Sequence, residues 1–354
     1  MAVGWAGSPL RTEIAMPHFV GLDASKATTS ICIVDEEGRT VREGVVPTEP
    51  KAIVGYLRGE RRRYRRVGLE SMSMASWLYE GLARAGLPVI CIEARHAHGV
   101  LKARLNKTDR NDARGIAELM RVSVYKAVHI KTRASQEAKL LLAARRHLRC
   151  KRGDIDNLIR GSLLQQGLKL QPAQRRTFGR RAAELAPSGS LLGEVVDRLL
   201  VVRSVVQEQV QALEQLIIER AGEDPVCRRL MTAPGVGAMT ALAYRAAIDV
   251  PERFTRSRDV GVHLGLTART YQSGFVDRKG RISKSGDEAA RTALYLAAQS
   301  ILMPRTRQTS LKTWGQNVAA SRGYLKGVIA VARRLAVILH RMWLDGTDFR
   351  SEPA

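Results

Sequence analysis

Four acidic residues lie where predicted strands and a predicted helix could gather them. Asp23 ends the first apolar run and Glu70 ends the run VGLE, and each is preceded by Gly-Leu. Neighbouring strands would place both carboxylates at one edge of a sheet. Asp109 and Asp112, in the segment KTDRNDA, are three residues apart and share one face of a predicted helix.

Four carboxylates held together repel each other unless hard divalent cations, which prefer oxygen ligands, lie among them. The pattern therefore predicts a site with two Mg²⁺ ions, or Mn²⁺ as the alternative, for in-line phosphoryl transfer. Taken alone, each acid is more typical of a helix cap or a solvated charge. The joint arrangement favours the metal site.

Lys107 and Arg110 flank the second acidic pair and have two interpretations. They could hold phosphate oxygens of a nucleic acid. They could equally neutralise acids in surface ion pairs, and the sequence leaves both interpretations open.

Ser273 lies in the segment YQSG, within what the sequence predicts to be a looped basic segment. A serine hydroxyl is a weak nucleophile unless neighbouring groups activate it. Basic residues follow that could hold a phosphate: Arg278, Lys279, Arg281 and Lys284. By composition alone Ser273 is an ordinary loop serine, and Ser283 and Ser285 are equal candidates.

The segment PGVG at 234–237 is similar to the turn of a helix-hairpin-helix module. The backbone amides of Gly235 and Gly237 could bind a DNA phosphate without base preference. A plain turn between helices explains the same residues equally well.

The overall charge points to a polyanionic partner. The 354 residues include 58 Lys and Arg against 34 Asp and Glu, a formal charge of +24. Aromatic residues make up only 5% of the chain, which disfavours binding by base stacking and favours backbone contacts. The four cysteines form no C-x-x-C pair, and no apolar run is long enough to span a bilayer. We expect a nucleic-acid-binding protein of the cytoplasm with no membrane contact.

The order of predicted elements indicates an α/β domain at the start of the chain. Three short strands form a meander from His18, and 49–60 is a predicted helix. A strand, a helix and a further strand follow up to Ile92, and helical segments continue to Tyr125. This order, β-β-β-α-β-α-β-α, is that of the ribonuclease H fold.

The middle of the chain is predicted to be helical. Apolar residues follow alternating steps of three and four, interrupted only by Gln209, as in a coiled-coil seam. The positions are Leu192, Val195, Leu199, Val202, Val206, Gln209, Leu213 and Leu216. The alternative is a long helix packed on its own domain. With an earlier basic helix around 136–164, the seam suggests a hairpin for dimerisation and nucleic-acid contact.

These elements together resemble one family, the DEDD transposases and site-specific recombinases of the insertion-sequence 110 family, which includes Piv-like invertases. The resemblance rests on GLDASK, LES, KTDRNDA, PGVG, LGLTARTYQSG and GRISKSGD, and it covers about residues 18 to 340. It implies a RuvC-like domain, a coiled-coil linker and a mainly α-helical transposase domain. It also implies that Asp23, Glu70, Asp109 and Asp112 bind Mg²⁺.

The resemblance further implies that Ser273 attacks DNA and forms a covalent phosphoserine. It implies donor and target DNA as partners, a structured bridge RNA that pairs with both, and a homodimer assembled into a dimer of dimers. A bacterial, nucleoid-associated protein follows. The two other functions considered are a RuvC-like endonuclease or junction resolvase, which would not need Ser273, and an architectural nucleic-acid-binding protein.

We therefore expect five regions. They are an N-terminal extension at 1–17, a RuvC-like catalytic domain at 18–128, a helical coiled-coil region at 129–222, a transposase domain at 223–345 and a tail at 346–354.

Overall fold

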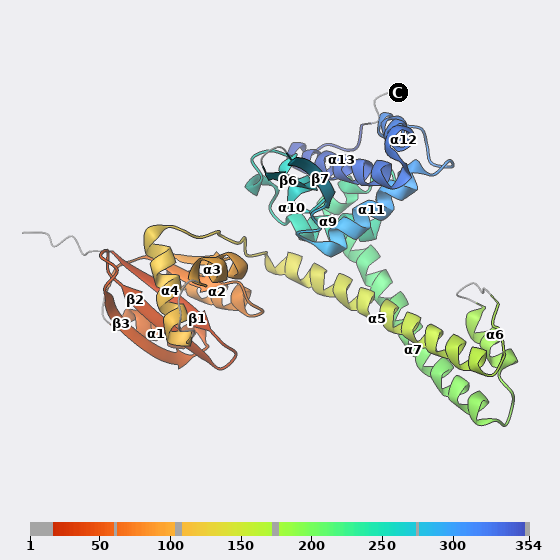
Figure 1. Ribbon diagram of the computed structural model, residues 1–354, viewed down its shortest axis with the longest axis horizontal. Coiled ribbons are helices and arrows are strands. Elements are labelled where there is room, and N and C mark those ends of the chain that lie inside the picture. The colour runs from red at the N-terminus through yellow and green to blue at the C-terminus, as the bar shows by residue number, and fades with distance from the viewer. Residues whose placement is uncertain (1–16, 60–61, 103–107, 172–176, 274–275, 351–354) are drawn as a thin grey trace, which may run out of the picture. The chain divides into compact units, whose positions relative to one another are not determined.

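The computed structural model describes residues 17–59, 62–102, 108–171, 177–273 and 276–350. The chain divides into two compact units, Met1–Lys131 and Thr132–Ala354. Each unit is described by itself (Figure 1). Lys107, one of the predicted phosphate contacts, lies outside the described residues.

Unit 1 is built on one five-stranded mixed sheet. Its strands are β1 (His18–Ala24), β2 (Thr28–Val34), β3 (Thr40–Pro47), β4 (Tyr64–Glu70) and β5 (Val89–Ile92). The spatial order is β3-β2-β1-β4-β5. The first three strands pair antiparallel as the predicted meander, whereas β4 pairs parallel to both β1 and β5.

Helices cover both faces of this sheet, as Figure 1 shows. They are α1 (Pro50–Arg58), α2 (Ala75–Arg84), α3 (Ala94–Leu101) and α4 (Asp109–Val122). One core contains Val20 and Leu69 with apolar residues of α1 and α2. A second core on the opposite face contains Phe19 with residues of α3 and α4. Alternate residues of each strand therefore serve different helical layers. A mixed α/β N-terminal domain is confirmed.

Unit 2 begins with two long helices joined by a short one. These are α5 (Arg133–Gln165), α6 (Phe178–Leu185) and α7 (Leu191–Glu223). Arg145 of α5 pairs with Glu214, whereas Asp156, further along α5, pairs with Arg203, earlier in α7. The partners advance in opposite directions, so the helices are antiparallel.

The predicted seam of α7 is divided between two faces of the helix. Gly193, Val196, Arg203, Val210 and Ile217 are buried, each one residue after a predicted position, and Ala221 is buried as well. Val195, Val202 and Leu216 are exposed, at 43%, 51% and 44%. Two neighbouring stripes of α7 are rich in apolar residues, and the predicted seam took residues from both.

The remaining helices surround the largest core of the molecule. They are α8 (Pro225–Leu230), α9 (Ala238–Ile248), the short 3-10 helix η1 (Pro251–Arg253), α10 (Asp259–His263), α11 (Glu288–Leu302), α12 (Ser310–Arg322) and α13 (Tyr324–Asp345). At their centre Tyr244 is fully buried and donates a 2.7 Å hydrogen bond to the carbonyl of Ala336. A mostly helical C-terminal part is confirmed.

The looped basic segment predicted around Ser273 is wrong. Residues Ala268–Ser273 form strand β6, Val276–Ile282 form β7, and the following residues begin α11. Every residue of β6 is exposed, so this strand has no apolar alternation from which a sequence pattern could predict it.

Within the described part of the chain, no helix is both long enough and apolar enough to cross a bilayer.

Candidate catalytic site and nucleic-acid surfaces

The first half of the candidate site is positioned by close contact between β1 and α4. Gly21 lies on the sheet face that α4 covers, and a Cβ atom there would overlap the backbone oxygen of Ala113. Asp23 follows two residues later on the same face of β1. Asp109 precedes Ala113 by about one helical turn. The contact therefore brings Asp109 to the level of Asp23 along the strand.

The same arrangement recurs on the neighbouring strand β4. A Cβ atom at Gly68 would lie 2.7 Å from Cγ2 of Ile116. Glu70 follows Gly68 by two residues, and Asp112 precedes Ile116 by about one turn. The strands are paired with Gly21 opposite Gly68. All four acids therefore lie toward the same end of the sheet.

The repeated Gly-Leu-acid triplet has a physical explanation in this register. In both strands the glycine lets α4 approach and the leucine, Leu22 or Leu69, enters the core on the other face. The acid then lies just beyond the edge of the helix-covered region. Each residue of the triplet therefore has a separate structural task.

The helix that carries two of the acids begins at the site. Thr108 caps α4 by accepting a 3.2 Å hydrogen bond from the backbone amide of Asn111. Asp109 and Asp112 lie in the first turn. Anionic groups are favoured there because the free amide groups of a helix start carry partial positive charge.

The four acids lie at a similar level along the strands, but their carboxylates do not form a closed set of metal ligands. Among the described residues, no group of three or more His, Cys, Asp or Glu side chains is spaced to hold a metal ion. The donor set itself fits a hard divalent cation, because it offers only carboxylate oxygens. Asp23 and Glu70 are partly buried, and Asp109 is exposed.

Two buried thiols near the sheet remain protonated at neutral pH. Burial, with a contribution from the charge of Glu70, raises the pKa of Cys91 to about 11. Burial and the charge of Glu43 raise the pKa of Cys32 to about 11. Hard cations such as Mg²⁺ prefer oxygen ligands to sulfur, so the carboxylates suit this ion better than the thiols.

Arg110 takes part in an ion pair. Its guanidinium contacts the carboxylate of Glu43 on β3. The Arg110 side chain is nevertheless 77% exposed. The pairing with Glu43, which lies 67 residues earlier in the chain, was not visible in the sequence.

Ser273 and its basic neighbours belong to unit 2. Ser273 is the last residue of β6 and pairs with Val276 of β7, while Arg278 lies opposite Tyr271. Ser273, Arg278 and Arg281 are exposed. Lys279 lies opposite Thr270 in the ladder. The structure therefore describes the serine and the acids on separate units.

The base of this hairpin is locked to the end of α10. A Cβ atom at Gly286 would overlap the carbonyl oxygen of His263, and one at Gly265 would overlap that of Ser285. Lys284 lies between them with a left-handed backbone (φ +53°), and its amide donates to the carbonyl of Gly265 at 3.2 Å. Lys284 is thus held by its backbone and has an exposed side chain.

The PGVG turn joins α8 to α9. Gly235 has a positive φ of +73°, and a Cβ atom there would lie 2.6 Å from the carbonyl of Ala297 in α11. Packing alone therefore requires glycine at this position. Gly237 precedes α9, and a Cβ atom there would have no described neighbour within 4 Å.

A mixed α/β domain with acids toward one end of its sheet, followed by a mostly helical part, fits the class of DNA transposases. The family model for DEDD transposases of the IS110 type matches residues 20–167. The model described as "Transposase IS116/IS110/IS902 family" matches residues 227–313. The chain belongs to the IS110 family of transposases.

Individual relatives agree with this assignment. The transposase for insertion sequence element IS1111A of Coxiella burnetii is 28% identical over 333 residues, which cover 90% of this chain and 88% of the relative. The transposase for insertion sequence element IS1328 of Yersinia enterocolitica is 26% identical, covering 80% and 85%. The similarity therefore spans both units.

Gly21→Ala tests how the acids are positioned. The added methyl group would overlap the α4 backbone, so we expect a loss of about 1–3 kcal/mol in the free energy of unfolding, measured with denaturant. Strand cleavage should fall with it. The control is Gly55→Ala in α1, where nothing lies within 4 Å and alanine should add about 1 kcal/mol. Equal stability of Gly21→Ala and the unmodified protein would contradict the proposed packing.

Proposed function

We propose that this transposase cuts and rejoins DNA by using Ser273 as nucleophile and Asp23, Glu70, Asp109 and Asp112 as ligands of divalent metal ions. The observation that carries the proposal is the common register of these acids, fixed by the approach of α4 to Gly21 and Gly68. The order of the five strands supports assigning unit 1 to the RuvC-like, ribonuclease H fold.

The proposed reaction conserves the phosphodiester bond energy. Oγ of Ser273 forms a bond to phosphorus, its proton leaves, and the bond from phosphorus to one sugar oxygen breaks. That sugar oxygen takes up a proton and becomes a hydroxyl group. A hydroxyl group from another strand then attacks the phosphoserine, which joins the strands in a new arrangement and releases Ser273.

The protein residues have separate tasks in this scheme. The four carboxylates would hold two Mg²⁺ ions, with Mn²⁺ as the alternative, and these ions would supply charge stabilisation to the entering and leaving oxygens. Arg278, Lys279, Arg281 and Lys284 would hold phosphate near Ser273. Because acids and serine belong to different units, we propose that the complete site forms between subunits.

Two substitutions separate this mechanism from its alternatives. We expect Ser273→Ala to abolish recombinant junctions and the protein–DNA adduct seen by denaturing electrophoresis, because the substitution removes the attacking hydroxyl. Asp23→Asn should abolish cleavage by removing a ligand charge. Junctions formed at the normal rate by Ser273→Ala would exclude the serine mechanism, whereas cleavage without junctions in that variant would favour a nuclease-type reaction. Undiminished cleavage by Asp23→Asn would remove the metal-site proposal.

We also propose that a bridge RNA guides target choice. The net charge of +24 suits a protein that holds nucleic-acid backbones while base pairing supplies specificity. DNA as substrate would in turn place the protein at the nucleoid.

The RNA proposal predicts a specific bound transcript. Protein purified from its native host should retain a defined RNA encoded beside its own gene, identified by sequencing the nuclease-protected fraction. Ribonuclease treatment of the protein, followed by removal of the ribonuclease, should abolish recombination. Adding back the transcript should restore it. Full recombination by RNA-free protein would exclude an obligatory guide.

Dimerisation is proposed to use the outer face of α7. Apolar residues with heptad spacing lie exposed there: Leu191, Val195, Val202, Val205 and Leu216. Arg198, Gln209 and Ala212 occupy the intervening positions of the same stripe. A second copy would bury this stripe as a coiled-coil seam, and two such dimers would form the larger assembly.

Val202→Glu combined with Val205→Glu tests this interface. Two carboxylates at its centre should convert the dimer to a monomer in light scattering, because burying unpaired charge is costly. Ile218→Glu is the matched control, since Ile218 is 55% exposed on α7 but lies off the stripe. An unchanged dimer in the double variant would contradict the interface.

A further inference from the structure

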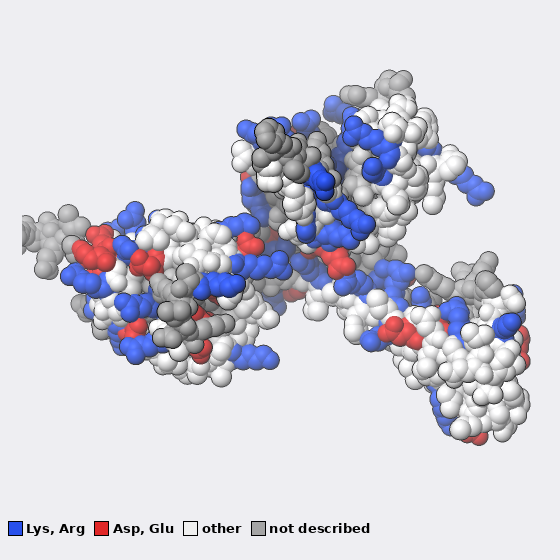
Figure 2. Space-filling view, viewed as in Figure 1, with Lys and Arg blue, Asp and Glu red and all other residues white. Residues whose placement is uncertain are grey.

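A long stretch of the C-terminal helices carries basic residues and no acidic ones. Between Ala289 and Leu344 the sequence contains no Asp or Glu. The same stretch contains nine Lys and Arg residues: Arg291, Arg305, Arg307, Lys312, Arg322, Lys326, Arg333, Arg334 and Arg341. Figure 2 shows Lys and Arg gathered over α12 and α13 without red side chains among them.

Two of these cations have structural tasks. The Nζ of Lys312 is buried and donates to the carbonyls of Met303, Pro304 and Thr306 at 2.8, 3.3 and 2.6 Å. Arg291 donates to the carbonyl of Leu264 beneath the hairpin. The other seven are exposed.

Several basic side chains elsewhere in the chain are neutralised by acids. On α5, Lys139 and Arg146 are paired with Asp287 and Glu288 at 2.9 Å. Within the described residues, none of the seven exposed cations of the acid-free stretch forms an ion pair. Unneutralised cations on one surface are expected where a polyanion supplies the counter-charge.

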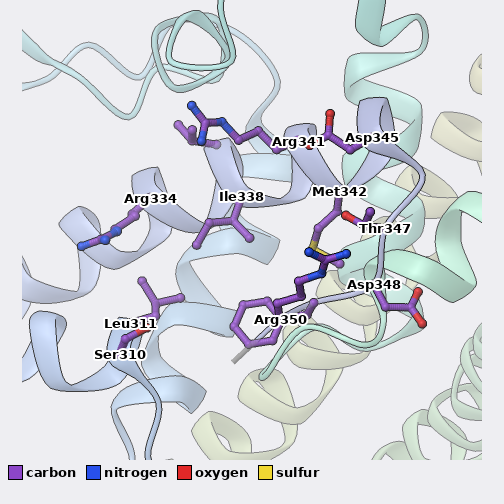
Figure 3. Close-up of a pocket in the computed structure, with 12 residues that line it drawn as sticks. Ser310, Leu311, Arg334, Ile338, Arg341, Met342, Asp345, Thr347, Asp348 and Arg350 are labelled. Atoms are coloured by element: carbon purple, nitrogen blue, oxygen red, sulfur yellow. The ribbon is translucent and has the colours of Figure 1, made fainter. Parts of the chain in front are cut away.

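A cavity of about 570 Å³ opens at one end of this surface, beside α13 and the start of α12. Its lining includes Arg334, Arg341 and Arg350. Figure 3 shows Arg334 at one end of the cavity and Asp348 at the other. The cavity is therefore polarised, with a cationic end and an end that also holds carboxylates.

The cavity also has an apolar wall. Leu311 of α12 and Ile338 and Met342 of α13 line it, together with Phe349. Phe349 is held in place because its backbone amide donates a 2.9 Å hydrogen bond to Thr232 Oγ1. Arg334 lies over the ring of Trp314, 4.7 Å from its centroid, which restrains its position. Cations and an apolar wall are thus presented together.

We propose that this cavity binds one unstacked nucleotide of a single DNA strand. The phosphate would contact Arg334 and Arg341, and the base would lie against the apolar wall near Phe349. A duplex would first have to flip a base out of its stack, which costs a few kcal/mol, so it should use this cavity much less than a single strand. The proposal rests on the proposed function, because strand exchange exposes unpaired nucleotides that must be held until they are rejoined.

The binding test uses the full chain carrying Ser273→Ala, without divalent metal, so that no cleavage occurs. The probes are a labelled oligothymidylate and a duplex of equal length, measured by fluorescence anisotropy. We expect Arg334→Gln with Arg341→Gln to weaken single-strand binding about tenfold. The slope of log affinity against log salt should fall by about 0.7 for each phosphate that the variant no longer neutralises. Duplex affinity should change much less.

The control is Arg322→Gln with Lys326→Gln, which removes two exposed cations of the same acid-free stretch outside the cavity. Equal single-strand losses in both double variants would overturn the proposal in favour of a diffuse charged surface. Equal losses for duplex and single strand in the cavity variant would also overturn it. Thermal unfolding confirms that each variant is folded.

A photoreactive thymine analogue in the oligothymidylate locates the base directly. We expect crosslinks to peptides that contain Met342 and Phe349, identified by mass spectrometry, and their loss in the cavity variant. Crosslinks confined to other peptides would overturn the proposal. Recombination by the Ser273→Ala protein would overturn the proposed chemistry but leave these binding results unaffected, so the two failures are distinguishable.

Discussion

The close contact of α4 with the two central strands is the constraint on which the candidate site depends. Side chains between a helix and a sheet normally keep the two backbones apart. Here Gly21 and Gly68 remove the side chains on one side of the contact, so that the backbone of α4 lies directly over β1. This contact fixes both the height and the rotation of α4, and therefore which of its residues reach the end of the sheet.

Charge is organised differently in the parts of this protein. Around the sheet and along α5, several basic residues are matched by acids, as in the pairs Arg110–Glu43 and Arg146–Glu288. Exposed pairs of this kind contribute little to stability, but they lower the local attraction for polyanions. For the exposed cations described on α12 and α13, no such matching occurs. A net charge alone does not distinguish these cases, because it counts a neutralised arginine and an unneutralised one equally.

The sequence predicted those features that depend on local periodicity or on adjacent strands. The meander, the strand at 66–70 and the placement of Asp23 and Glu70 at strand ends follow from short apolar runs. The β6–β7 hairpin was missed because β6 is polar and exposed along its length. The buried stripe on α7 differs by one residue from the predicted one because two apolar stripes lie side by side on this helix. Periodicity alone does not say which of them packs against α5. The Glu43–Arg110 pair and the cavity beside α13 depend on contacts between distant segments, although the acid-free stretch was visible in the sequence.

The hairpin that carries Ser273 contrasts with the acidic half of the site. The acids are attached to a sheet with helices packed on both faces, whereas β6 is exposed along its whole length. Two-stranded ribbons are marginally stable by themselves. The fixed part of this ribbon is its base, where Gly265 and Gly286 allow backbone to pack against backbone. The direction in which Ser273 points is therefore set by the base contacts and by whatever covers the exposed strand, so a bound nucleic acid would complete the positioning of the nucleophile.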